Sequence, residues 1–442
     1  MKRMSIVGLG KLGLPMAAAM ASRGYTVVGY DSDPAKIERI RSNVFPCEPG
    51  LDELIRQYSK RLTFTSDLSA VRDTSCTFVV VPTPSLKNGD FSIRHLHSAL
   101  KSVGAALRGK KGPHVVAVVS TVLPGSMEKL RRTLEKSSGK KCPGQIGLCY
   151  NPAFIALGNV IHNFLHPDFV LIGESDRQSG ETLERFYMHF CRTKAAIHRM
   201  NYINAELAKI AVNTFITMKI SFGNMIARIC EQLPDAHSET VTRAVGADRR
   251  IGTHYLKGAL GYGGPCFPRD NKAFSFVARR LGLRAYSAEA TDRINRNQID
   301  WLASYVLEKV RPNDVIAILG LSYKPDTDVI DESQGVALAK VLLRKKRRLV
   351  LYDPAAMPEA AKLLEGQVTF ARNLAEALRK AQLIVITTPW REFMDLDGRT
   401  LASSNGHPKM VLDCWRMLEK SRLGKKVEYV PLGVGLNTGV LS

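Results

Sequence analysis

The sequence has no apolar run long enough to cross a bilayer, which takes roughly 20 residues. It also has no apolar core or cleavage site of a secretory signal near its start, where two basic residues lead directly into a strand-like segment. These absences argue against a secreted or membrane-anchored product. We therefore expect a cytoplasmic protein with no membrane partner.

The eight cysteines are scattered, with no CxxC pair and no clustering with histidine. This pattern excludes a disulfide framework and a zinc site. We expect reduced thiols and no bound metal.

Acidic residues are few beside basic ones, 41 against 63, so the formal net charge is +22. Such an excess fits nucleic-acid binding, an anionic small substrate or simply a basic surface. The densest basic run, 344–348, follows a predicted helix, where cations complement the helix dipole. It contains no interleaved aromatic residue, which argues against a nucleic-acid platform. We expect no nucleic-acid partner.

A chain of 442 residues is too long for a single hydrophobic core, so two or three domains are expected. The first begins with a strand that passes through a GxGxxG pattern into a helix at 14–22. A second strand, 25–30, ends on Asp31. The turn that would hold a dinucleotide's pyrophosphate consists of Gly8, Gly10, Lys11, Leu12 and Gly13.

This arrangement is typical of a Rossmann dinucleotide site, in which the acid at the end of the second strand binds the ribose hydroxyls. Ser32 and Asp33 follow Asp31, where an NADP site would favour arginine. The sequence therefore predicts an NAD site.

Two further apolar strands, 77–81 and 115–119, read as parallel strands covered on both faces. Pro82 and Thr83 follow the first of these strands, and Thr121 follows the second. Both places lie at the edge where ligands bind in such sheets. Thr121 either faces the nicotinamide or substrate, or caps the next turn.

One long helix is predicted from about 204 to 231, and a further helical stretch is predicted that contains residues 248–252. Lys209 and Asn213 are four residues apart, so they share a face of the long helix. Lys209 either reaches out to solvent or donates to a developing oxyanion.

Residues 261–270 are predicted to form a loop that presents the Cys266 thiol beside Arg269 and Asp270. Its three glycines would let the backbone approach a ligand closely. Two interpretations remain open: Cys266 is an activated nucleophile, or it is a small buried residue in a glycine-rich turn.

A second alternating unit has strands at 314–321, 348–352, 383–388 and 410–413, without a GxGxxG pattern. It should therefore bind something other than a second dinucleotide. The predicted fold is α/β, with two Rossmann-like doubly wound domains joined by the long helix. We expect an NAD-binding domain at 1–200, a helical dimerisation domain at 201–310 and a nucleotide-sugar domain at 311–442.

These segments together resemble the UDP-glucose/GDP-mannose dehydrogenase family, and most closely its UDP-glucose 6-dehydrogenases. The resemblance spans nearly the whole chain, and its most specific part is the Gly-Tyr-Gly-Gly-x-Cys-Phe-Pro-basic-Asp segment at 261–270. It implies two successive hydride transfers from the sugar C6 to NAD, a nucleoside diphosphate sugar substrate, and a homodimer or larger homo-oligomer.

By this resemblance Cys266 traps the aldehyde, Lys209 and Asn213 hold the C6 oxygen, and Asp270 with a water takes the alcohol proton. Thr121 joins them as a catalytic residue. The implied cofactor contacts are Gly8, Gly10, Lys11, Leu12, Gly13, Asp31, Pro82, Thr83 and Thr121. The implied substrate contacts are Phe154, Ile155, Lys209, Asn213, Arg250, Tyr255, Leu256, Lys257, Gly261, Gly263 and Lys324, with Arg250 reaching across the dimer.

The chain departs from the family where Ala153 and Leu157 replace two glutamates, and where Asp331 replaces an arginine near the cofactor phosphates. A carboxylate at 153 is a plausible activator of the water that hydrolyses a thioester. Without it, hydrolysis should be slower unless Asp270 or another base substitutes.

Three other functions compete with a UDP-glucose 6-dehydrogenase. They are a relative acting on a UDP-N-acetylhexosamine or GDP-mannose, a nucleotide-sugar-binding protein without turnover, and a nucleic-acid binder. Retention of Cys266, Lys209, Asn213 and Asp270 argues against loss of turnover.

Overall fold

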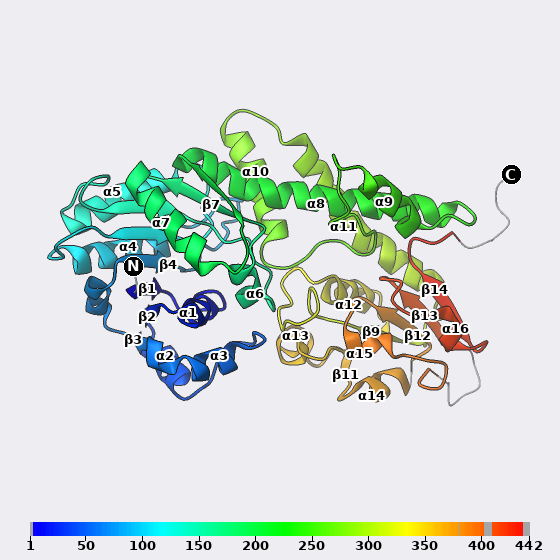
Figure 1. Cartoon of the computed structure of the whole chain (residues 1–442). Coiled ribbons are helices and arrows are strands. Elements are labelled where there is room, and N and C mark those ends of the chain that lie inside the picture. Colours follow the sequence, from blue (N-terminus) through cyan, green and yellow to red (C-terminus); the bar gives the residue numbers. More distant parts are fainter. Residues whose placement is uncertain (1–2, 380, 402–408, 436–442) are drawn as a thin grey trace. The chain divides into compact units, whose positions relative to one another are not determined.

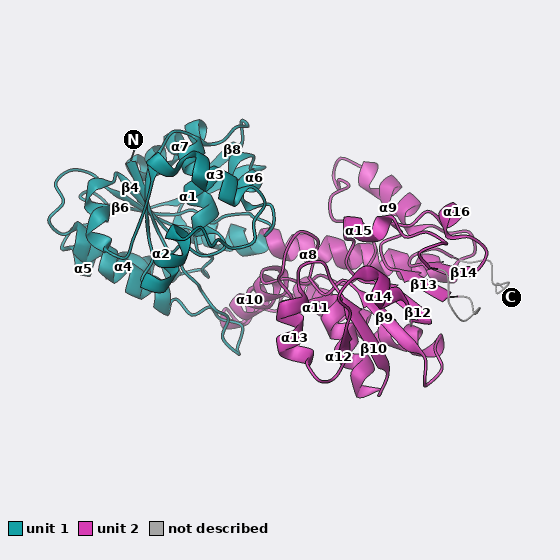
Figure 2. Ribbon diagram, turned by 90° about the horizontal axis from the view of Figure 1, so that it is seen from below, with its two compact units in different colours: residues 1–211 teal, residues 212–442 magenta. Residues whose placement is uncertain are grey.

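The computed structural model describes residues 3–379, 381–401 and 409–435. The chain divides into two compact units, Met1–Ala211 and Val212–Ser442, which Figure 2 shows in different colours. Strands and helices alternate in both units, and each unit contains one sheet (Figure 1). The predicted α/β class with two Rossmann-like sheets is confirmed. The predicted three-part division at 200 and 310 stays a prediction.

The sheet of the first unit has eight strands in the order β3-β2-β1-β4-β5-β6-β7-β8. Its strands are β1 (Arg3–Val7), β2 (Thr26–Tyr30), β3 (Leu62–Thr65), β4 (Cys76–Val79), β5 (Val115–Val118), β6 (Gly147–Tyr150), β7 (Phe169–Glu174) and β8 (Ala196–Met200). The strands β1 to β6 pair in parallel, whereas β7 runs antiparallel to β6. This reversal brings the start of β7 to the edge where β6 ends.

Helices pack on both faces of this sheet, over two separate hydrophobic cores. They are α1 (Gly13–Ser22), α2 (Pro34–Arg41), α3 (Leu51–Gln57), α4 (Arg94–Leu107), α5 (Ser126–Ser138), α6 (Val160–Leu165) and α7 (Arg177–Phe190). One core contains Leu14 and Phe186, and the other contains Leu100 and Leu130. Apolar residues on both faces explain why β4 and β5 read as uninterrupted apolar runs.

The second unit has a six-stranded parallel sheet in the order β11-β10-β9-β12-β13-β14. Its strands are β9 (Val315–Leu319), β10 (Arg348–Tyr352), β11 (Thr369–Phe370), β12 (Leu383–Ile386), β13 (Lys409–Asp413) and β14 (Val427–Pro431). Its helices are α9 (Ser238–Ala247), α10 (Phe267–Arg280), α11 (Tyr286–Glu308), α12 (Gln334–Arg344), α13 (Met357–Leu364), α14 (Leu374–Arg379), α15 (Arg391–Met394) and α16 (Lys420–Leu423). The basic run begins at the last residue of α12, as predicted.

The long helix α8 (Tyr202–Gln232) begins in the first unit and ends in the second. Contrary to expectation, it is long and apolar enough to cross a membrane by length and composition, and among the described helices it alone meets that test. However, its buried side carries Asn213, Thr217 and Asn224, which hydrogen-bond to neighbouring segments of the second unit. These bonds are those of a core helix of the fold.

The predicted helical stretch at 248–252 is wrong. The helix α9 ends at Ala247, and the amides of Ile251 and Gly252 both donate to the Asp248 carbonyl, 2.9 Å away, in a tight turn. The chain leaves helical geometry at Asp248, where ψ is 121°, and the turn closes at Gly252 with φ +72°. Arg250 therefore lies on an exposed turn.

Candidate active site

The three glycines after β1 have different roles. Gly8 has φ +101°, and a β-carbon there would lie 2.2 Å from the Val80 carbonyl oxygen. A β-carbon at Gly13 would lie 1.8 Å from the Gly8 carbonyl oxygen, whereas one at Gly10 would meet nothing within 4 Å. The outer glycines thus let strand and helix pack closely, and the middle one leaves open space beside the N-terminus of α1.

The helix α1 has no side-chain cap, because its N-cap residue is Leu12. Within the helix the Leu14 amide already donates to the Gly10 carbonyl oxygen (3.2 Å) and Pro15 has no N–H, so the amides offered to an anion are those of the turn at 11–13, where Lys11 is exposed. This end of the helix fits a pyrophosphate, as the sequence predicts.

Asp31 follows β2 and is 6% exposed. Its carboxylate accepts hydrogen bonds from the Leu9 amide (2.9 Å), the Asp33 amide (3.1 Å) and Lys36 Nζ (2.8 Å). Burial raises the pKa of Asp31, but the bonds from Lys36 and the two amides outweigh it and hold the pKa below its usual value. Asp31 is thus an ionised acceptor in the position expected for a ribose contact.

The segments after β4 and β5 are joined by hydrogen bonds. Thr83 Oγ1 donates to the Thr121 carbonyl oxygen (2.8 Å), and Ser120 Oγ donates to the Val81 carbonyl oxygen (2.6 Å). Thr83 is buried, Pro82 is exposed and Thr121 is half-buried. The structure therefore brings the predicted strand-end residues together at one edge of the sheet.

Two glutamates that sequence reasoning did not assign hold the segments that lead into α5 and α6. Glu206 on α8 is fully buried and accepts from the amides of Gly125 (2.8 Å) and Met127 (2.7 Å) at the start of α5. Glu48 accepts from the amides of Gly158 (3.0 Å) and Val160 (2.6 Å) at the start of α6. Each carboxylate caps a helix from another part of the chain.

Lys209 is 5% exposed, so it does not reach out to solvent. Its Nζ donates to the Ala153 carbonyl oxygen (2.9 Å) and lies 4.2 Å from the centre of the Phe154 ring. The lysine is thus fixed against the segment that follows β6.

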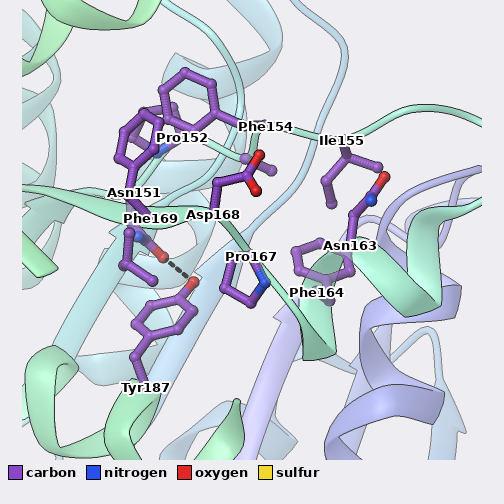
Figure 3. A pocket seen from close by; sticks show the side chains of 12 residues that line it. Asn151, Pro152, Phe154, Ile155, Asn163, Phe164, Pro167, Asp168, Phe169 and Tyr187 are labelled. Carbon is purple, nitrogen blue, oxygen red and sulfur yellow. Dashed lines mark hydrogen bonds between the residues drawn. The ribbon is translucent and has the colours of Figure 1, made fainter. Parts of the chain in front are cut away.

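A small open pocket lies at this segment, between the loop after β6, α6 and the start of β7 (Figure 3). Ala153, Phe154 and Ile155 line it, together with Asp168. At its base Tyr187 donates to Asn151 Oδ1 (2.5 Å), and Asn151 Nδ2 donates to the Leu171 carbonyl oxygen (3.0 Å). The pocket therefore has a bonded polar base and largely apolar sides.

In the second unit, Cys266 occupies the N-cap position of α10, so the predicted loop at 261–270 becomes a helix at Phe267. The expectation of a loop is wrong for its last four residues, because Pro268 stands in the first helical turn, where proline is favoured. Cys266 is exposed, whereas six of the other seven cysteines are buried. The structural alternative, a small buried cysteine, is therefore excluded.

Asp270 lies in the first turn of α10 and is 1% exposed. It accepts from Asn213 Nδ2 (2.6 Å) and Arg269 Nε (3.3 Å), and its amide donates to the Cys266 carbonyl oxygen (2.8 Å). The structure thus links three of the predicted catalytic residues within one unit: Cys266, Asp270 and Asn213.

The glycines before Cys266 allow the loop to approach other protein segments. A β-carbon would lie 2.4 Å from Asn295 Oδ1 at Gly261, and 2.4 Å from the Glu332 carbonyl oxygen at Gly263. Asn295 on α11 also accepts from the Tyr262 amide (2.7 Å) and donates to its carbonyl oxygen (3.0 Å). Sequence reasoning missed this anchoring residue, which lies about thirty positions away.

The remaining predicted substrate contacts all lie in the second unit. Arg250 has an 88% exposed side chain and pairs with Asp248 (2.6 Å). Tyr255 is exposed, Leu256 is buried and Lys324 is half-buried. Lys257 pairs with Glu239 at 3.2 Å, and the Asp331 carbonyl oxygen accepts from the Gly264 amide at 2.8 Å. Over the described part of the chain, no group of three or more His, Cys, Asp or Glu residues could hold a metal ion.

Comparison with known families decides the class of enzyme. The NAD-binding, central and UDP-binding domain models of the UDP-glucose/GDP-mannose dehydrogenase family match residues 2–191, 203–297 and 317–420. The chain belongs to this family. It is an NAD-dependent dehydrogenase of nucleotide sugars, and the glycine turn with Asp31 is the part that fits NAD.

A UDP-glucose 6-dehydrogenase of Haloferax volcanii is 32% identical to the chain over 400 residues, which cover 89% of this chain and 93% of the relative. A UDP-glucose 6-dehydrogenase of Rhizobium meliloti is 32% identical over 433 residues, 96% and 97% of the two chains. The structure of a UDP-glucose dehydrogenase from Pyrobaculum islandicum superimposes with a TM-score of 0.88 at 32% identity, covering 99% of this chain and 98% of that one.

Proposed function

We propose that the protein oxidises the C6 alcohol of UDP-glucose to the carboxylate of UDP-glucuronate, with two molecules of NAD reduced per sugar. The observation that carries this proposal is the linked set in the second unit, an exposed thiol at a helix N-terminus one turn before the buried Asn213–Asp270 pair. The names of the relatives at 32% identity support UDP-glucose as the sugar.

In the first oxidation, Asp270 takes the proton of the C6 hydroxyl through a water, while Lys209 and Asn213 hold the oxygen as it becomes negative. The hydrogen on C6 leaves with its electron pair, and NAD accepts it as hydride. Lys209 and Asn213 are suited to act together, because residues four apart on a helix project from one face. Thr121, held by Thr83, would position the reacting groups from the edge of the first sheet.

The aldehyde is then captured by Cys266, whose sulfur forms a bond to C6 and whose proton is transferred away. Loss of the second hydride converts the thiohemiacetal to a thioester, and water hydrolyses it to the acid. A helix N-terminus stabilises negative charge, so the position of Cys266 favours both its attack and its departure. Because Ala153 provides no carboxylate, hydrolysis should be the slow step.

The sugar nucleotide would contact Phe154 and Ile155 after β6 and, in the second unit, Tyr255, Leu256, Lys257, Gly261, Gly263 and Lys324. The net charge of +22 suits the diphosphates of substrate and cofactor.

We further propose a cytoplasmic homodimer formed through α8. Within the second unit this helix exposes Phe215, Phe222, Met225 and Ile229, with 40–58% of each residue accessible. A contiguous apolar stripe of this kind is typical of an interface between chains. Arg250, on its exposed turn, would then reach the partner's site.

The test is to incubate the protein with NAD and UDP-glucose, count the NADH formed per sugar, and follow the intact mass of the chain. Two NADH per UDP-glucuronate with repeated turnover supports the proposal, and Cys266→Ser should abolish acid formation. Acid formation by Cys266→Ser would show that the thiol is not the nucleophile. The same assay with UDP-N-acetylhexosamines and GDP-mannose ranks the substrates, and absence of NADH with all of them would overturn the enzymatic proposal.

A further inference from the structure

The ring of Tyr323 packs directly on the glycines that precede Cys266, within the second unit. A β-carbon added at Gly264 would lie 2.5 Å from Tyr323 Cε2, 2.6 Å from Cδ2 and 3.1 Å from Cζ. One added at Gly263 would lie 3.4 Å from Tyr323 Cβ and 2.4 Å from the Glu332 carbonyl oxygen. Gly264 also has φ +82°, a conformation that favours glycine. The two glycines thus leave room for an aromatic ring two residues before the thiol.

The connection between β9 and α12 holds this ring in place. Just before it, the amides of Leu321 and Ser322 donate to the Asp353 carboxylate at 2.7 and 2.9 Å. The Tyr323 amide donates to the Val329 carbonyl oxygen (2.9 Å), which closes the connection back on itself. The backbone that carries the ring is therefore fixed by hydrogen bonds within the second unit.

The same connection also makes a backbone hydrogen bond to the loop. The Asp331 carbonyl oxygen accepts from the Gly264 amide at 2.8 Å. Gly264 therefore has the ring of Tyr323 against its α-carbon and a hydrogen bond on its nitrogen. Only Pro265 separates Gly264 from Cys266 at the N-cap of α10, and proline has little backbone freedom. A shift of Gly264 would thus move the thiol.

The packing of the ring, and not its hydroxyl group, makes these contacts. Over the described part of the chain, no residue forms a hydrogen bond with the Tyr323 hydroxyl. Burial raises the pKa of Tyr323 well above its ordinary value, and negative charge on Cys266 raises it further. The phenol therefore stays protonated, and it lies near enough to the thiol for the charge of one to affect the other.

We propose that Tyr323 is a positioning residue for the Cys266 thiol, and that its ring keeps the loop at 261–265 in the place from which the sulfur captures the C6 aldehyde. This inference rests on the proposed function. In the step that it serves, the sulfur bonds to C6, the carbonyl π electrons move to the oxygen, and the oxygen takes up the proton that the thiol gives up. The carbon keeps its oxidation state until the second hydride leaves to NAD.

The place of Tyr323 in the chain also relates it to the substrate. It is followed by Lys324, a proposed contact of the sugar nucleotide. Asn295 anchors the loop through the Tyr262 backbone, four residues before the thiol. Of these two anchors, Tyr323 contacts the loop nearer to Cys266. The segment that fixes the thiol is thus the one that would hold the substrate.

The experiment separates the two half-reactions of the 6-aldehyde of UDP-glucose, with full-length protein. With NADH the aldehyde is reduced to the alcohol, which needs no thiol, whereas with NAD it is oxidised to the acid through Cys266. The variants are Tyr323→Phe, which keeps the ring, Tyr323→Ala, which removes it, and Tyr323→Leu, which keeps apolar volume where alanine impairs folding. Tyr305→Ala is the matched control, because it removes a half-buried ring of the same unit that packs against Trp301 on α11, with 5.8 Å between ring centres.

A second measurement needs no substrate. Peptide-resolved hydrogen exchange follows the amides of residues 261–266 in the free protein, among them that of Gly264. Loss of the ring should make them exchange about tenfold faster in Tyr323→Ala and Tyr323→Leu, because local opening of the loop then costs less free energy. Tyr323→Phe and Tyr305→Ala should match wild type.

Tyr323→Ala and Tyr323→Leu should keep aldehyde reduction and lose about 100-fold in aldehyde oxidation, since a displacement of about 1 Å at a reacting group has effects on that order. Tyr323→Phe and Tyr305→Ala should retain both half-reactions. Unchanged oxidation in Tyr323→Ala would overturn the assignment, as would equal loss of both half-reactions in the alanine and leucine variants, loss of oxidation in Tyr323→Phe, or unchanged hydrogen exchange. Absence of both half-reactions in the wild type would instead overturn the proposed function and this assignment together.

Discussion

The turn after β1 and the turn after β9 share the same backbone arrangement. Gly8 and Gly320 have φ of +101° and +106°, and each amide donates to a tyrosine carbonyl oxygen of the neighbouring strand at 2.8 Å. The acids that follow those tyrosines, Asp31 and Asp353, both accept from the amide after the glycine.

The two turns differ in how many hydrogen bonds the chain itself makes to their polar groups. Asp353 accepts six hydrogen bonds, including one from Trp390, whereas Asp31 accepts three. The helix α12 is capped by Ser333, whereas α1 has no side-chain cap. The donors that NAD would use are thus present in the first turn and already bonded in the second. A shared fold does not by itself determine which ligand is bound.

The largest effect should come from the glycines that both turns share. A β-carbon at Gly13 or Gly335 would lie 1.8 or 2.1 Å from the carbonyl oxygen of Gly8 or Gly320. Gly13→Ala and Gly335→Ala should each lower the free energy of unfolding by about 3 kcal/mol. Urea denaturation of each variant measures this loss. If neither substitution changed the free energy of unfolding, the close approach of these glycines would not be needed for packing.

The acids should separate the two turns. Asp353→Asn replaces one of the two oxygens that together accept from six donors with an NH2 group, so it should cost about 3 kcal/mol of stability. Asp31→Asn should cost about 1 kcal/mol and mainly weaken NAD binding. Urea denaturation and calorimetric titration with NAD check both variants. An equal loss of stability in the two variants would contradict the inference that the chain bonds the acid of the second turn more completely than the acid of the first.

Much of this comparison could be predicted from the sequence, because the glycine pattern, the strand lengths and Asp31 are local signals. The long helix was likewise predicted to within a few residues. The capping carboxylates Glu48 and Glu206 could not be predicted, since each is roughly 80–110 residues from the amides it binds. The reversal of β7 was missed because nothing in its apolar run indicates its direction. The helix predicted over 248–252 failed because Asp248 leaves helical geometry directly after α9, with ψ at 121° and its carboxylate accepting from the Arg250 amide.

A smaller effect is expected at the middle glycine of the first turn. An added methyl group at Gly10 meets no protein atom, so Gly10→Ala should leave stability unchanged and lower NAD affinity about tenfold, or about 1.4 kcal/mol. Gly109→Ala is the matched control, because its methyl group also meets nothing within 4 Å. Both values come from calorimetric titration with NAD. Unaltered affinity in Gly10→Ala would mean that the pyrophosphate does not approach this glycine.

The smallest effect concerns acid stability. The folded-state pKa of Asp31 is lowered below 3.8, so this residue contributes stability that is present above that value and lost as pH falls through the folded pKa. The difference in unfolding free energy between wild type and Asp31→Asn should be constant above about pH 5 and shrink below it. Denaturation midpoints from pH 3 to about pH 7 test this. A difference that grows on acidification would reverse the assigned direction.

The boundary between the two units falls inside α8, after Ala211, so it separates Lys209 from Asn213. A chimera that joined one unit to the other unit of a relative would have to splice within this helix. Because each helical residue turns the chain by about 100°, inserting or deleting one residue at the splice would rotate one of these side chains away from the other. Recombination in this family should therefore succeed only where the junction preserves the phase of the helix, however well each half folds alone.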